Sequence, residues 1–68
     1  MKTFQLKNEF IELNKLLKLL GLVETGGQAN LIITDGEVRV NGEVEFQKRK
    51  KLRTGDVVVF EDVKIKIE

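Results

Sequence analysis

The 68-residue chain contains no cysteine, histidine, proline, tryptophan or tyrosine. Without cysteine it can form no disulfide and offers no thiolate, and without histidine it lacks the commonest general base. Zinc sites built from these two residue types are excluded as well. No apolar run approaches the ~20 residues of a membrane span, and the N-terminus MKTFQLKNEF lacks the apolar stretch of a signal peptide. We therefore expect a cytoplasmic protein that needs no metal or cofactor.

Positive charge is concentrated in one short segment, Lys48–Arg53, with the sequence KRKKLR. Five of its six residues are cationic, and Leu52 is its only apolar anchor. The whole chain has a net charge of only +1, so the other 62 residues together carry −4. A compact basic patch on a slightly acidic body is typical of a polyanion site, because each neutralised phosphate releases counterions. Taken alone, the run is explained equally well as a solvated loop that aids solubility.

Two amphipathic helices are predicted in the first half of the chain. Asn8 can cap a helix over residues 9–20 that ends before Gly21, with an apolar stripe at helical spacing formed by Phe10, Leu13, Leu17 and Leu20. The second helix is predicted over residues 26–34, with a capping box of Thr25 and Gln28 and an apolar face formed by Ala29, Ile32 and Ile33. Gly36 would close it.

Two glycines, Gly26 and Gly27, stand in the first turn of this second helix. Each costs about 1 kcal/mol relative to alanine in a helix, so a reason for them is expected. Bare backbone N–H groups at a helix start can bind a phosphate. Close packing of the helix start against the sheet is the competing explanation.

From Glu37 onward the hydrophobic period becomes two, which predicts strands. Asn41-Gly42 is a strong hairpin signal. A three-residue loop, Val40-Asn41-Gly42, would pair Arg39 with Glu43 and keep one face apolar, so it is preferred over a two-residue loop. After a turn at Thr54-Gly55-Asp56, two strands over residues 57–60 and 63–67 would pair Val58 with Ile65 and Phe60 with Val63. The chain is thus predicted to be a single α+β domain over residues 1–68, with two helices packed on a small antiparallel sheet.

The order of these signals resembles the S4 RNA-binding domain from about Ile11 to Val59. The strings GEVRVNGEVE and KLRTGDVVV are the most specific part of the resemblance. The other matching residues are Leu13, Leu16, Leu17, Gly21, Thr25, Gln28, Ala29, Ile33 and Gly36. The likeness is greatest to small stand-alone bacterial S4-like proteins, the YbcJ-like group, which also carry a basic cluster before the Gly-Asp turn. The resemblance implies an S4-type (αL) fold and RNA binding without catalysis.

Three cations that are usual in this family are absent here. Gly26 stands where the family usually has arginine, Asn30 where it has a later basic residue, and Glu43 where lysine often follows Asn-Gly. Arg39 does match a frequent basic position. The segment Lys48–Arg53 must then supply most of the charge.

We therefore expect an RNA-binding site formed by Gly26, Gly27, Gln28, Arg39, Lys48, Arg49, Lys50, Lys51 and Arg53. Gln28 is explained as well by its capping role, and Arg39 by a pair with Glu43. All four phenylalanines, Phe4, Phe10, Phe46 and Phe60, are assigned to apolar faces, which leaves no aromatic platform for stacked bases. Contact with structured RNA through phosphates and shape is the better expectation.

The carboxylates form no convincing catalytic pair, so no enzymatic activity is expected. The expected partner is structured RNA, such as ribosomal or transfer RNA, or a ribosome-associated protein, and the chain is expected to be a monomer. The alternatives are a protein-interaction module whose basic run docks an acidic partner, and non-specific DNA binding.

Overall fold

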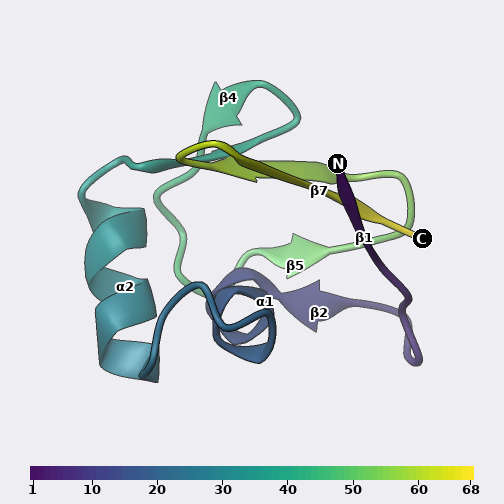
Figure 1. The fold of residues 1–68 in the computed structure, drawn as a ribbon, viewed down its shortest axis with the longest axis horizontal. Coiled ribbons are helices and arrows are strands. Elements are labelled where there is room, and N and C mark those ends of the chain that lie inside the picture. Colours follow the sequence, from purple (N-terminus) through teal and green to yellow (C-terminus); the bar gives the residue numbers. More distant parts are fainter.

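The computed structural model describes residues 1–68 as an α+β structure with a mixed sheet (Figure 1). Its elements are β1 (Lys2–Phe4), β2 (Ile11–Glu12), α1 (Leu13–Leu19), α2 (Gly26–Thr34), β3 (Val38–Val40), β4 (Glu43–Val44), β5 (Lys51–Leu52), β6 (Val57–Phe60) and β7 (Val63–Ile67). Five strands form a sheet in the order β1-β7-β6-β3-β4, and β2 and β5 form a separate pair. The expected fold class is confirmed, with one addition, since β1 runs parallel to β7.

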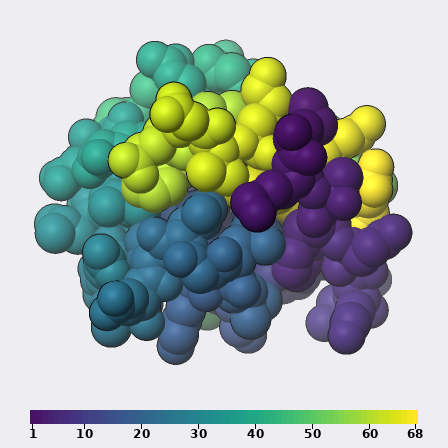
Figure 2. All heavy atoms as spheres, viewed as in Figure 1, coloured from purple at the N-terminus to yellow at the C-terminus, as the bar shows by residue number.

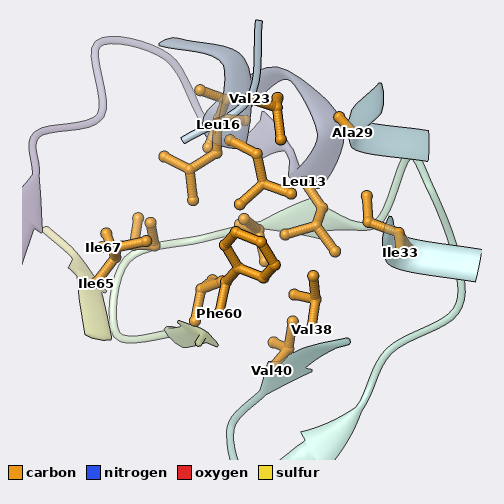
Figure 3. Close-up of a cluster of buried hydrophobic side chains, with 14 residues drawn as sticks. Leu13, Leu16, Val23, Ala29, Ile33, Val38, Val40, Phe60, Ile65 and Ile67 are labelled. Carbon is orange, nitrogen blue, oxygen red and sulfur yellow. The ribbon is translucent and has the colours of Figure 1, made fainter. Parts of the chain in front are cut away.

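The core lies between the five-stranded sheet and the layer that contains both helices, β2 and β5. All 14 buried residues are apolar. Strands β3, β6 and β7 alternate, so that every second side chain enters the core while Arg39, Lys64 and Lys66 lie exposed on the opposite side, here called the open face. Figure 3 shows the Phe60 ring among side chains from both layers, including Leu13 and Ile33 from the helices.

Helix α1 is shorter than its apolar pattern predicts, and Asn8 does not cap it. It begins at Leu13 after Glu12, which makes no side-chain capping hydrogen bond. Ile11 and Glu12 instead pair with Leu52 and Lys51 in the β2–β5 ladder. Because the residues just before α1 form a strand in this ladder, Phe10 lies outside the helix rather than on its apolar stripe. Neither helix is long and apolar enough to cross a membrane.

Helix α2 has the predicted bounds and cap. The Gln28 N–H donates to the Thr25 hydroxyl (3.0 Å), and Ala29 and Ile33 are completely buried. The return bond of the capping box differs by one residue, since the Gln28 side chain accepts from the Glu24 N–H (2.9 Å) rather than from Thr25. Local capping chemistry is therefore sufficient to define this helix.

The last two strands have the predicted register, with Val58 opposite Ile65 and Phe60 opposite Val63. Strict alternation on both strands explains this agreement, because a slip of one residue would expose every apolar side chain.

The β3–β4 hairpin has a two-residue loop, and the predicted three-residue loop is wrong. Val40 pairs with Glu43, and Arg39 with Val44, so Arg39 does not face Glu43. Asn41 and Gly42 both have positive φ, 53° and 88°, as a type I′ turn requires. Turn geometry prevails because β4 has only two residues and lies at the sheet edge, where mixing apolar and charged neighbours costs little.

Phe46 was assigned to an apolar core face, but its side chain is 60% exposed. The two-residue loop places Val44 opposite Arg39, on the side of the sheet away from the core. The Glu45 N–H donates to the Val38 carbonyl (2.9 Å), so the pairing continues and Phe46 follows Val44 to that side. Its ring covers Gly36 instead, where an added Cβ would lie 3.2 Å from the ring. Phe60 was also assigned to the core from strand register, and its side chain is buried, at 7% exposure.

A side-chain network joins the Asn41-Gly42 turn to the Gly55-Asp56 turn. Asp56 accepts from the Asn41 amide (3.0 Å) and from the Arg53 N–H (2.9 Å), and Asn41 in turn accepts from the Val57 N–H (2.9 Å). The two turns are 15 residues apart in the sequence. The network therefore holds the backbone at Arg53, where the basic run ends, against the sheet.

We expect Asp56→Ala to lower the free energy of unfolding by about 1–3 kcal/mol, because two donors lose their carboxylate partner. In a chain of this size the melting temperature falls by roughly 4–8 °C per kcal/mol. Asp62→Ala is the matched control, since Asp62 is exposed and its carboxylate makes no hydrogen bond, and it should change stability by less than about 0.5 kcal/mol. Thermal melting of both variants checks this, and equal melting temperatures would contradict it.

Candidate nucleic-acid interface

The basic segment, Lys48–Arg53, presents its cations to solvent. Lys48, Arg49, Lys51 and Arg53 are exposed and Lys50 is half-buried, whereas Leu52 is completely buried and anchors the segment in the core as predicted. Because Lys51 and Leu52 form β5, Lys51 and Arg53 lie on the face of the strand opposite Leu52. The segment is thus partly a strand rather than only a loop.

Backbone hydrogen bonds attach the basic segment to the start of α1. The Leu13 N–H donates to the Lys50 carbonyl (2.9 Å), and the Asn14 N–H donates to the Lys48 carbonyl (3.0 Å). These are the free N–H groups of the helix N-terminus, which would otherwise need a capping side chain. In Figure 1 the green segment that leads into β5 runs from β4 toward α1. The attachment uses carbonyls, so the cationic side chains remain available for a ligand.

One of the cations is partly neutralised within the protein. The Nε of Arg49 lies 2.8 Å from an Oε of Glu12, and the two side chains are 77% and 27% exposed. An ion pair this exposed contributes at most about 1 kcal/mol and is weakened by salt. The pair orients Arg49 without removing it from the surface.

The position of Phe10 beside the basic segment was not predicted from the sequence. The Nζ of Lys51 lies 5.0 Å from the centroid of its ring, and the guanidinium carbon of Arg53 lies 5.6 Å from it. Both distances fall within the ~6 Å range of cation–π contacts. Phe10 is half-buried and is not among the residues that pack on the core. No local signal indicates this position, because it follows from the pairing of β2 with β5, about 40 residues later.

The start of α2 is uncovered at Gly26 and Gly27. A Cβ added at Gly26 would meet nothing within 4 Å, and one at Gly27 only the Thr25 hydroxyl oxygen at 3.9 Å. Close packing therefore does not explain the two glycines. Their N–H groups donate no hydrogen bond within the protein. Gln28 is exposed, and its side-chain oxygen is engaged by Glu24.

A contact between the helices places the start of α2 and the basic segment on neighbouring parts of the surface. Asn14 connects the two regions, because its backbone N–H donates to the Lys48 carbonyl. Its side-chain amide donates to the Asn30 side chain of α2 (3.1 Å). Asn30 follows Gly26 and Gly27 by one helical turn, so the three share a face of α2. Asn30, which stands at a usual basic position of the S4 domain, here joins the two helices.

Arg39 lies apart from the other predicted site residues. It is exposed on the open face of the sheet, between Val44 and Val59, and its guanidinium donates to the Gly42 carbonyl (3.3 Å). The helices and the basic segment lie on the other side of the sheet. Of the nine predicted residues, Arg39 alone lies on the open face, whereas the basic segment is attached to the start of α1, and Gly26, Gly27 and Gln28 form the start of α2.

No group of three or more carboxylates is arranged to hold a metal ion. The chemistry available at this surface is therefore that of exposed cations, free helix N–H groups and one aromatic ring among cations. Such a surface can bind a polyanion, with cations for phosphates and N–H groups for their oxygens.

Comparison with known proteins agrees with this geometry. The S4 domain family matches residues 4–68. The "Putative RNA-binding protein YbcJ" of Escherichia coli (strain K12) is 48% identical over 61 residues, which are 88% of this chain and 87% of that protein. The "Probable ribosome maturation protein RlbA" of Bacillus subtilis (strain 168) is 40% identical over 53 residues, which are 78% of this chain and 75% of that protein.

A solved structure agrees as well. The solution structure of Escherichia coli YbcJ superposes with a TM-score of 0.73 at 43% identity, and the match covers 98% of this chain and 86% of that one. It is described as revealing a motif, ALFAL, that is involved in RNA binding. The resemblance inferred from the sequence is confirmed, and the chain belongs to the S4 domain family.

Proposed function

We propose that this protein binds structured RNA and catalyses no reaction. The observation that carries the proposal is the basic segment itself, whose exposed cations stand on a backbone that is hydrogen-bonded to α1. Membership of the S4 domain family and the names of the relatives support it. Lys48, Arg49, Lys50, Lys51 and Arg53 would contact phosphates, and the free N–H groups of Gly26 and Gly27 would receive one more.

Ribosomal RNA is the first class of RNA to test, because one relative is named as a ribosome maturation protein. The same name supports a cytoplasmic place of action and a ribosome-associated partner. Residues 1–68 would act as one unit, since a single cluster of buried residues joins both helices to the sheet. Docking to an acidic protein is the competing function, and binding that resists RNase would favour it.

The dependence of RNA binding on salt tests whether cations neutralise phosphates. We expect the logarithm of the association constant for a stem-loop RNA to fall linearly with the logarithm of the salt concentration. If about four cations each neutralise a phosphate, the slope is roughly −3 to −4. Fluorescence anisotropy with a labelled stem-loop measures it. A flat salt response, or no binding at low salt, would contradict RNA binding.

Replacing Lys48, Arg49, Lys50 and Lys51 by glutamine should abolish or greatly weaken RNA binding. These side chains lie at the surface, so each change should alter stability by less than about 0.5 kcal/mol. The matched control replaces Lys2, Lys18, Lys64 and Lys66 by glutamine, which removes the same charge from exposed positions elsewhere. If both variants lose affinity equally, net charge rather than the basic segment drives binding. Arg39→Gln, assayed alone, tests whether the open face contributes.

Two substitutions at Gly26 separate helix stability from RNA binding. The site is open, so either side chain fits. Gly26→Arg should tighten RNA binding by adding a cation beside the free N–H groups. Gly26→Glu should raise the melting temperature, because a negative charge is favourable at a helix start, yet weaken binding by repelling phosphate. Affinities of the two variants that do not differ would reject a phosphate contact at this helix start.

A further inference from the structure

Phe10 borders a groove between the N-terminal segment and α1. The groove has a volume of about 780 Å³, which is within the range of ligand-binding sites. The residues that line it include Phe4, Asn8, Phe10, Lys15 and Leu19. Figure 2 shows an indentation between the purple N-terminal segment and the blue α1. Leu19, at 62% exposure, and the half-buried Phe10 give this groove apolar surface that the core does not use.

The charge around the groove is predominantly positive. Lys7 and Lys15 line it, and Lys51 and Arg53 reach the Phe10 ring from β5. The carboxylate in its lining, Glu12, is paired with Arg49, and the four cations form no ion pair of their own. The groove borders the basic segment, because Phe10 lines the groove and its ring also lies within cation–π distance of Lys51 and Arg53.

We infer that Phe10 stacks against an unpaired nucleobase that flanks the duplex held by the basic segment. Lys51 and Arg53 contact the phosphates on either side of that nucleotide, and Asn8 offers an amide to the base edge. A nucleotide suits this place because it combines an apolar ring face with a negative charge, and the groove presents an aromatic ring among cations. The inference rests on the proposed RNA binding, and it adds recognition of an unpaired base to the contact with structured RNA that the sequence predicted.

Phe10→Leu tests the stacking contact. The two ligands are a blunt RNA duplex and the same duplex with a short single-stranded extension. We expect the parent to prefer the extended RNA, and Phe10→Leu to lose about five- to tenfold in affinity for it while binding the blunt duplex within about twofold of the parent. An equal loss for both RNAs would show that Phe10 only positions Lys51 and Arg53, and no loss would show that it makes no contact. Either result overturns the inference.

Phe10→Trp provides a direct signal, because the chain has no other tryptophan and no tyrosine. Its fluorescence should be quenched by the extended RNA and much less by the blunt duplex. Phe46→Trp, at an exposed position over Gly36, is the control that should not respond. A parent that binds the duplex without preferring the extension overturns this inference alone. A parent that binds neither RNA overturns the proposed function, and with it this inference.

Discussion

The pairing of β2 with β5 is the contact on which the rest of the site depends. It consists of only two residue pairs, Ile11 with Leu52 and Glu12 with Lys51. Through it the basic segment reaches the start of α1, where the Lys50 and Lys48 carbonyls replace a capping side chain. The same pairing places Lys51 and Arg53 over Phe10. Helix start, cations and aromatic ring are thus positioned together by one short ladder.

This arrangement separates what holds the protein together from what would contact a ligand. The basic segment is attached by its backbone and by the buried Leu52, while its cationic side chains contribute little to stability. All buried residues are apolar, so no buried charge ties folding to the surface. The cationic side chains of the basic segment can therefore vary without loss of the fold, because they make few contacts within the protein.

The departures from the usual S4 pattern have different structural consequences. Asn30 forms a hydrogen bond to Asn14 that joins the helices. Gly26 leaves the start of α2 open, with free N–H groups at the position where the family usually has arginine. Glu43 lies on the edge strand β4 opposite Val40, and it lines the same hollow as Lys50 of the basic segment, so its charge partly offsets the positive charge there.

The sequence by itself determined those elements whose signals are local. Helix α2 follows from Thr25 and its apolar face, and the β6–β7 register follows from strict alternation. The basic segment and its buried Leu52 were also predictable, because the cations are consecutive in the sequence and Leu52 is the one apolar residue among them. Only the tertiary structure decided where α1 begins, since the ladder to β5 and the Lys48 and Lys50 carbonyls prevail over the local cap at Asn8.

The tertiary structure also decided which face each site residue occupies. Arg39 lies on the open face, away from the basic segment, because its neighbours Val38 and Val40 enter the core. Phe10 leaves its predicted helical stripe and lies under two cations that are about 40 residues away in the sequence. The physical reason is the same in both cases: a periodic pattern specifies which residues share a face, but long-range pairing specifies what that face meets.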